Sequence, residues 1–252
     1  MIPRTREPVD TDDVLVRVRR LDGKAPDLED ALGVLSESER TRAGRFVSQE
    51  DQQSYVFAHA LLRRTLSEMD DSVAPAAWTF DSEPHGKPML AHHGTRGRIA
   101  FNLTHTRGVV ACACASGGSV GIDVEAIDRR TDYMELATGY FAPAEIADLR
   151  NATEPDRPAR FIELWTLKEA YVKAVGRGLG LDLQTFAFLR DDAGLLHFTP
   201  PSGDSGRWTF ALFALDARYR MALAATSGGR RFKVTASPPY ADESALVPLW
   251  SA

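Results

Sequence analysis

Residues 158–175 carry the pattern that most constrains the fold, because the helix they predict is built for burial. At about 100° per residue, the apolar side chains gather in one stripe: Phe161, Leu164, Trp165, Tyr171, Val172 and Val175. Lys168 falls near the middle of that stripe, where a lysine is unexpected because this side chain is rarely buried without a partner for its charge. Glu169 and Lys173 are four residues apart and lie side by side at its edge. The predicted helix therefore presents one carboxylate and one ammonium to the element that packs beside its apolar stripe.

Sequence signals mark both ends of this helix. Asp156 is a suitable N-cap, and Pro158 suits the first turn because its missing N–H is not needed there. Gly176 and Gly178 follow the last apolar position and stop the helix. We therefore expect one continuous helix over residues 158–175.

A strand-like segment upstream, residues 121–125, carries two carboxylates. Its alternation sends Ile122 and Val124 to one face and Asp123 and Glu125 to the other. Carboxylates two residues apart on a strand lie roughly 6 to 7 Å apart, close enough to share one hard cation. Taken alone, the segment also fits a solvated strand face, which is the commoner case.

Glu169 adds a third carboxylate to Asp123 and Glu125 if the helix packs beside this strand. Three oxygen ligands with Lys173 next to them favour Mg²⁺ bound together with substrate phosphates, because Mg²⁺ usually takes few protein ligands. Taken alone, Glu169 and Lys173 also fit an exposed helical pair worth roughly 0.3–0.5 kcal/mol. The presence of both motifs in one chain favours the functional interpretation.

The two motifs resemble the signature of the Sfp-type 4′-phosphopantetheinyl transferases, a Gly-Ile-Asp-hydrophobic-Glu strand followed by a Trp-x-x-Lys-Glu-(Ala/Ser)-x-x-Lys helix that ends in Gly-x-Gly-Leu. Residues 121–125 and 165–179 match both parts in the same order. The resemblance covers most of residues 36–190 and extends to four shorter features: Gly86-Lys87-Pro88, Phe101-Asn102-Leu103-Thr104-His105-Thr106, Phe141 and Glu145. The long motifs are specific, whereas the short ones alone would mean little.

Strands and helices are grouped along the chain rather than alternating, which indicates an α+β fold with mainly antiparallel pairing. Periodicity predicts strands at residues 14–18, 78–80, 99–103, 109–115, 120–125, 186–189, 207–215 and 220–225, and helices at 36–47, 51–69, 133–140, 143–151 and 158–175.

The resemblance implies the 4′-phosphopantetheinyl transferase fold, with two similar lobes related by a pseudo-twofold axis, each a small antiparallel sheet with helices. We assign residues 1–116 to the N-terminal lobe and residues 117–227 to the C-terminal lobe, which carries the metal site. Residues 228–252 form a tail that lacks periodicity. Packing of this tail across the other lobe and mobility both stay open.

The resemblance also implies a reaction. A serine hydroxyl of an apo acyl or peptidyl carrier protein would attack the β-phosphate of coenzyme A and release 3′,5′-ADP. Asp123, Glu125 and Glu169 would hold Mg²⁺, or Mn²⁺ in its place, on the pyrophosphate. Glu169 is also the candidate base for the serine proton, a role that competes with metal binding for the same oxygens. Lys173 would stabilise charge on the bridging oxygen.

Six residues match family positions that would contact coenzyme A, the co-substrate: Arg42, Lys87, Thr104, His105, Lys168 and Lys173. The two helical lysines would pair with phosphates, although both also fit lysines that reach solvent from a helix edge. Arg42 would bind the 3′-phosphate, since a guanidinium suits phosphate geometry. One departure is Glu39, which stands where family members often have a second basic residue. We therefore expect a 3′-phosphate pocket that is weaker or built differently.

The net charge of −5 argues against a general nucleic-acid binder, which is normally basic.

Carrier proteins are generally acidic as well, so apolar contact should carry much of their binding, with residues around Phe141 contributing. The pathway served stays open among fatty-acid, polyketide and nonribosomal-peptide synthesis. Two lobes in one chain can build the cleft without a second copy, so we expect a monomer.

The composition, with 44% hydrophobic and 26% charged residues among 252, is typical of a globular protein. No apolar run reaches about 18 residues, and the first residues are polar rather than signal-peptide-like, so we expect a cytoplasmic protein with no membrane partner. Cys112 and Cys114 project to one face of a strand, where we expect them to be buried and reduced.

Two rival functions compete with transfer. A metal-dependent phosphodiesterase or nuclease also uses acids with a lysine, but its usual Glu-x-Lys lies on a strand, whereas Glu169 and Lys173 have helical spacing. A non-catalytic module that binds coenzyme A or a carrier protein would be expected to lose a metal ligand or the lysine. Asp123, Glu125, Glu169 and Lys173 are all present, which favours the transferase.

Overall fold

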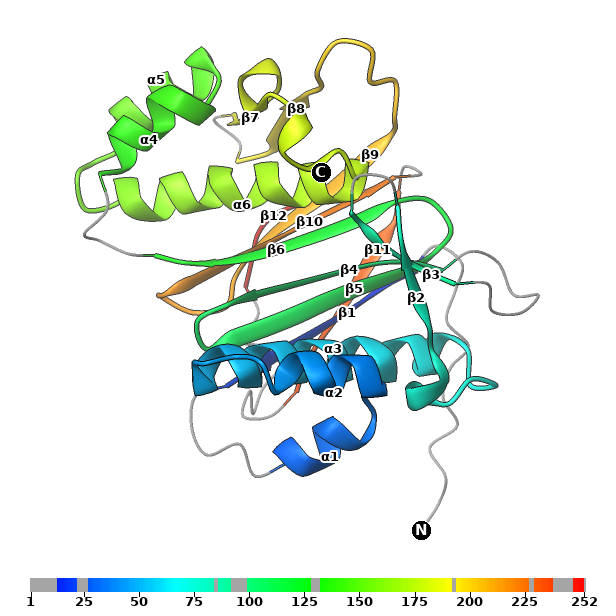
Figure 1. Cartoon of the computed structure of the whole chain (residues 1–252). Coiled ribbons are helices and arrows are strands. Elements are labelled where there is room, and N and C mark those ends of the chain that lie inside the picture. The colour runs from blue at the N-terminus through cyan, green and yellow to red at the C-terminus, as the bar shows by residue number, and fades with distance from the viewer. Residues whose placement is uncertain are drawn as a thin grey trace.

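The computed structural model describes residues 13–21, 27–83, 86–91, 99–127, 132–191, 194–226, 229–237 and 247–251. In this part of the chain, two four-stranded sheets lie face to face, and helices cover the outer face of each (Figure 1). Helices α1, α2 and α3 cover the first sheet, and α4, α5 and α6 lie over the second. The mixed α+β fold of two lobes agrees with the prediction.

The first lobe contains, in order, β1 (Asp13–Arg20), α1 (Leu28–Gly33), α2 (Glu37–Ala43), α3 (Gln49–Met69), β2 (Phe80–Ser82), β3 (Pro88–Leu90), β4 (Ile99–Thr106) and β5 (Val109–Ser116). The second contains β6 (Val120–Ala126), α4 (Tyr133–Tyr140), α5 (Pro143–Asn151), α6 (Arg157–Val175), β7 (Ala187–Arg190), β8 (Leu196–Thr199), β9 (Trp208–Ala214) and β10 (Tyr219–Thr226). Strands β11 (Arg231–Ser237) and β12 (Val247–Ser251) follow.

The first sheet has the strand order β11-β1-β5-β4, and the second has the order β12-β9-β10-β6. Their facing sides form one apolar core, to which β5 contributes Val109, Ala111 and Ala113. The alternate residues of β5, which include Cys112 and Cys114, face α3 on the other side. Both cysteines are buried and carry free thiols, as the sequence predicts.

Helix α6 lies unusually close to β6, and Gly121 makes this approach possible. A Cβ atom at Gly121 would come within 2.0 Å of the Ala170 carbonyl oxygen and 2.6 Å of the Ala174 nitrogen. Only glycine fits this contact. The approach brings the carboxylates of β6 to the polar edge of α6, which is the packing that the metal hypothesis requires.

The C-terminal segment adds an edge strand to each sheet. Strand β11 pairs in parallel with β1 in the first sheet, and β12 pairs antiparallel with β9 in the second. Arg231 and Lys233 of β11 form ion pairs with the buried Asp13, at 3.1 and 2.7 Å. Residues 231–237 thus pack on the first lobe, although the parallel pairing is an exception to the antiparallel prediction.

Several element boundaries differ from the prediction. Trp78 does not lie in a strand, because the turn Pro75–Ala77 precedes it and β2 begins only at Phe80. Asp156 makes no hydrogen bond to the first turn of α6, and its carboxylate instead accepts one from Thr153 Oγ1 at 2.6 Å. Gly176, with a φ of 78°, ends α6 where expected. No helix in the described residues is long and apolar enough to cross a membrane.

Candidate functional site

A polar cavity of about 420 Å³ lies where β4, β6 and α6 meet. Its lining contains six of the residues that the sequence analysis selected, together with Leu103 and Trp165: Thr104, His105, Asp123, Glu125, Glu169 and Lys173. Strand β4 supplies the first two, β6 the next two and α6 the last two. Residues from both lobes therefore converge on one cavity.

Asp123 and Lys173 form the central contact of this cavity. The Lys173 ammonium donates to Asp123 Oδ1 at 2.5 Å and to Thr104 Oγ1 at 3.2 Å, and the Thr104 hydroxyl donates to the same Asp123 oxygen at 3.2 Å. The other oxygen of Asp123, Oδ2, is buried and has no hydrogen-bond partner among the described residues. A buried carboxylate oxygen without a partner is costly, which points to a missing ligand.

Negative charge in this cavity is only partly compensated. Burial, followed by the charge of Asp123, raises the pKa of Glu125 to about 7. Burial and the Asp123 charge also raise the pKa of Glu169. Burial raises the pKa of Asp123 itself, against the opposing effect of Lys173. Three carboxylates that disfavour one another's ionisation are typical of a site that takes a cation.

The donor set fits a hard divalent cation, whereas the present geometry is not yet a metal site. Among the described residues, no three acidic, histidine or cysteine side chains lie close enough together to hold an ion. Lys173 already occupies one Asp123 oxygen. The fit rests on the unpartnered Asp123 Oδ2 and on the uncompensated charge of Glu125 and Glu169.

His105 lies at the exposed rim of the cavity. Desolvation and then the Lys173 charge lower its pKa, so the imidazole is mostly neutral near pH 7 in the ligand-free protein. The charge of Asp51, at the start of α3, opposes this effect.

Lys168 does not reach this cavity, and its predicted pairing with phosphates is not supported. Its side chain is 0% exposed and its ammonium lies 2.8 Å from Glu145 Oε2. It also donates to the carbonyl oxygens of Leu183 and Phe186, at 2.8 and 2.7 Å. These contacts use all three ammonium donors and leave none for a ligand.

A second cavity, of about 550 Å³, adjoins the first and shares Glu169 and Lys173 with it. Lys87 lies in its wall and donates to the Ala174 carbonyl oxygen at 2.9 Å, and burial lowers its pKa. The sequence analysis did not select the other lining residues, which are mostly small or apolar: Gly86, Pro88, Asn102, Gly139, Tyr140, Val172, Gly176, Gly178, Leu181, Asp182 and Leu183.

Asn102 and Tyr140 are the most informative of these additions. Asn102 Oδ1 accepts a hydrogen bond from the Ile122 N–H at 3.0 Å and thereby ties β4 to β6. Tyr140 is 45% exposed at the end of α4 and packs edge-to-face on Trp165. Asn102 lies inside a quoted motif, but neither residue carried a signal of charge or spacing that could have found it.

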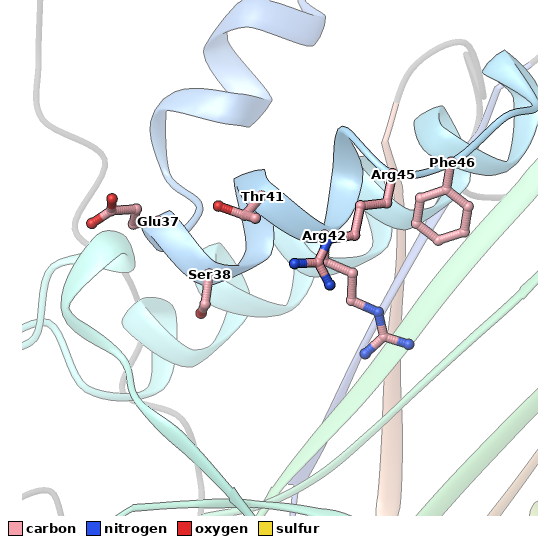
Figure 2. A pocket seen from close by; sticks show the side chains of 6 residues that line it. All are labelled: Glu37, Ser38, Thr41, Arg42, Arg45 and Phe46. Carbon is pink, nitrogen blue, oxygen red and sulfur yellow. The ribbon is translucent and has the colours of Figure 1, made fainter.

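Arg42 lies apart from both cavities, on α2. A larger depression of about 940 Å³ is lined by Glu37, Ser38, Thr41, Arg42, Arg45 and Phe46, as Figure 2 shows. The Arg42 guanidinium lies 5.4 Å from the centre of the Tyr55 ring. Gln52 of α3 donates to the Ala43 carbonyl oxygen at 3.0 Å, which ties the end of α2 to the start of α3.

Glu39, the departure noted in the sequence, has a structural role. It is buried, and its carboxylate accepts hydrogen bonds from Arg63 at 2.8 and 2.9 Å and from the Ser36 N–H at 2.8 Å. Glu39 therefore caps α2 and neutralises Arg63. It does not line the depression around Arg42.

Phe141 is also internal, so a carrier surface in this region has to be formed by the residues around it. It is 1% exposed and packs against Phe161 and Trp165. The exposed apolar residues of this region are Leu136 and Tyr140, one helical turn apart on α4.

Comparisons with known proteins match both lobes. The description "4′-phosphopantetheinyl transferase, N-terminal" fits residues 22–117, and "4′-phosphopantetheinyl transferase superfamily" fits residues 119–224. Among solved structures, the holo-[acyl-carrier-protein] synthase of Thermotoga maritima overlaps 44% of this chain and 63% of that chain, at 23% identity and a TM-score of 0.36.

Curated relatives are closer in sequence. The 4′-phosphopantetheinyl transferase HetI of Nostoc sp. is 33% identical over 63% of this chain and 67% of that protein. The 4′-phosphopantetheinyl transferase Sfp of Bacillus subtilis is 27% identical over 77% of this chain and 83% of that protein. These matches show that the chain belongs to the 4′-phosphopantetheinyl transferase superfamily, as an enzyme of the Sfp type.

Proposed function

We propose that this enzyme transfers 4′-phosphopantetheine from coenzyme A to a serine of an apo acyl or peptidyl carrier protein, in a Mg²⁺-dependent reaction that releases 3′,5′-ADP. The observation that carries the proposal is the convergence of Asp123, Glu125, Glu169 and Lys173 on one cavity between the lobes. A phosphoryl transfer needs concentrated positive charge on the pyrophosphate and a base near the nucleophile.

Asp123, Glu125 and Glu169 are the residues that would hold Mg²⁺, or Mn²⁺ in its place. When bound, the ion would neutralise charge on the pyrophosphate oxygens. The unpartnered Oδ2 of Asp123 and the raised pKa of Glu125 support this assignment. Cation binding would offset the mutual repulsion that the three carboxylates now experience.

Glu169 and Lys173 would act on the reacting groups. Glu169 lines both cavities, so a carrier serine that enters there could give its proton to this carboxylate, whose raised pKa suits a base working near neutral pH. The Lys173 side chain is 29% exposed, and its ammonium can donate to phosphate oxygens at the cavity mouth.

The nucleotide part of coenzyme A would lie on the side of Thr104 and His105, with Arg42 beyond them and Lys87 on the opposite side. Neutral His105 would bind a proton when a phosphate approaches, because added negative charge raises its pKa. Arg42 and Arg45 line one depression, and no ion pair engages either guanidinium within the described residues. Together these residues support a phosphate-rich ligand.

We also propose that the enzyme acts as a monomer in the cytoplasm. A single chain supplies every residue named for the site, so a second copy is not needed to complete it. The carrier protein would contact the exposed apolar residues Leu136 and Tyr140 of α4, of which Tyr140 lines the second cavity.

The test is the intact mass of purified apo carrier proteins after incubation with this enzyme, coenzyme A and Mg²⁺. Fatty-acid, polyketide and nonribosomal-peptide carriers are compared, each with an EDTA control. We expect a metal-dependent gain of one phosphopantetheine on at least one carrier. Glu169→Gln should abolish the gain, whereas Glu135→Gln, which removes an exposed carboxylate of α4, should retain it.

Three outcomes contradict the proposal. Transfer that persists in EDTA after removal of bound metal would refute the role of the three carboxylates. Tight binding of coenzyme A without transfer to any carrier would favour a binding module. Hydrolysis of coenzyme A without a carrier would instead favour a phosphodiesterase.

A further inference from the structure

We propose that Asn102 is a positioning residue for the transfer reaction, because its side-chain carbonyl holds β6 against β4 and thereby places Asp123 at the boundary between the lobes. The inference rests on the proposed function. It adds a residue that acts through the Asp123 carboxylate rather than on the reacting groups.

Strands β4 and β6 meet at the lobe boundary without pairing. In the described part of the chain they are outer strands of different sheets, and no strand ladder joins them. Strand β6 lies between β4 and α6 (Figure 1). One edge of β6 is used by its pairing with β10, so the N–H groups of the other edge need different partners. The alignment of the lobes here therefore depends on side chains.

Asn102 supplies a partner for the N–H that directly precedes Asp123. Its Oδ1 accepts a hydrogen bond from the Ile122 N–H at 3.0 Å, and Asn102 is buried. Two residues further along the same face of β4, the Thr104 hydroxyl donates to Asp123 Oδ1 at 3.2 Å. Strand β4 thus holds the backbone of β6 at one residue and the carboxylate at the next.

Helix α6 holds the same segment from the other side. Gly121 lies so close to α6 that a Cβ atom there would come within 2.0 Å of a helix carbonyl oxygen, so β6 cannot move toward the helix. The Lys173 ammonium of α6 donates to Asp123 Oδ1 at 2.5 Å. Loss of the Asn102 hydrogen bond would release β6 on the side of β4 and shift the Asp123 carboxylate relative to the ammonium.

An amide suits this position because it accepts a hydrogen bond without adding charge. Asn102 lines the second cavity together with Glu169 and Lys173, and burial and the Asp123 charge already raise the pKa of Glu169. Asn102→Asp keeps an acceptor but adds a carboxylate, whereas Asn102→Leu keeps a similar volume and has no acceptor. The two substitutions therefore separate the hydrogen bond from the charge.

The test first measures transfer by the wild type, so that failure of the proposed function is seen separately. In Asn102→Leu, we expect kcat to fall at least about 20-fold while KM for coenzyme A changes less than about threefold, because the displaced groups act mainly in the transition state. Asn102→Ala also lacks the acceptor and cannot clash, so the same result is expected of it if Asn102→Leu does not fold.

A second measurement is the affinity for Mn²⁺ in the presence of coenzyme A and without a carrier, from an electron paramagnetic resonance titration of the free ion. Asn102→Leu should weaken Mn²⁺ binding about tenfold. Asn102→Asp should retain it within about threefold, because it keeps the acceptor and an added carboxylate does not repel a cation. A purely structural role would not separate these two variants.

Thr226→Val is the matched control. Thr226 Oγ1 accepts the Ser119 N–H at 2.7 Å, so the substitution removes the same kind of bond one residue before β6 begins. Thr226 lines neither cavity. The control should keep kcat and Mn²⁺ affinity within about twofold of the wild type even if its melting temperature falls.

Three results would overturn the proposal. The first is a kcat within about threefold of the wild type in folded Asn102→Leu or Asn102→Ala. The second is an equal loss of kcat in Thr226→Val, because a weaker lobe boundary would then explain the effect. The third is equal weakening of Mn²⁺ binding in Asn102→Leu and Asn102→Asp, which would show that the acceptor is not what places Asp123.

Discussion

Glu125 is expected to make the metal-free enzyme less stable as pH rises. Its pKa is about 7 in the folded protein and about 4.5 in an unfolded chain, so the folded state holds the proton more tightly. The free energy of unfolding then falls between about pH 4.5 and 7 and is flat outside this window, as far as this group is concerned. At about 1.4 kcal/mol per pH unit, the loss is about 3 kcal/mol at most.

The assay is urea denaturation in EDTA at pH 5 and pH 7.5, for the wild type and for Glu125→Gln. The variant should be more stable than the wild type at pH 7.5 by about 2–3 kcal/mol, with a smaller difference at pH 5. Mg²⁺ should stabilise the wild type at pH 7.5 and do so much less in the variant. Glu135→Gln serves as the control for loss of an exposed carboxylate.

The reasoning is refuted if Glu125→Gln keeps the full pH dependence of the wild type. In that case the carboxylate would not be desolvated or repelled in the folded protein. A variant that is less stable at pH 7.5 would have the same meaning, because the charged form would then be favoured by its surroundings.

Three further changes give separate predictions. Gly121→Ala should destabilise the fold by about 2–4 kcal/mol in urea melts, because its Cβ would meet the Ala170 oxygen at 2.0 Å; wild-type stability would contradict the packing. Lys173→Met should lower kcat more than about 100-fold and should also lower the melting temperature, because it leaves the buried Asp123 carboxylate without its ion-pair partner; a kcat within about threefold of the wild type in the folded variant would exclude a role in transfer. Leu136→Ser with Tyr140→Ser should raise KM for the carrier protein and spare that for coenzyme A, whereas equal effects on both would exclude a carrier surface there.

The sequence predicted the parts of the site that follow from periodicity. Alternation placed Asp123 and Glu125 on one face of a strand, and helical spacing placed Glu169 beside Lys173. It also placed both cysteines on one buried face of their strand, and in the structure this face packs against α3. These features depend on local geometry, which a single segment determines by itself.

The sequence did not predict features that depend on contacts between distant segments. Strand β11 joins β1 in parallel through ion pairs with Asp13, and nothing in the periodicity of residues 228–252 indicated this. The role of Glu39 on α2 depends on its ion pair with Arg63, which comes from the next helix, α3. The resemblance pointed to the region around Phe141 as a carrier surface, but which of its side chains are exposed depends on packing: Leu136 and Tyr140 are exposed, and the ring of Phe141 fills the core.

Lys168 and Lys173 belong to one sequence motif, but their positions around the helix show that they face different surroundings. Five residues correspond to about 140° around a helix, so the two lysines cannot face the same ligand, whereas Glu169 and Lys173 are only about 40° apart. Lys168 lies in the apolar stripe, and a buried ammonium requires a buried acid. Burial of Lys168 therefore requires an internal partner in place of the phosphate that the motif suggested, and the fold identifies this partner as Glu145, at the start of another helix. The presence of two like charges in one motif is thus a weak argument for a shared function when the helix turns them to different sides.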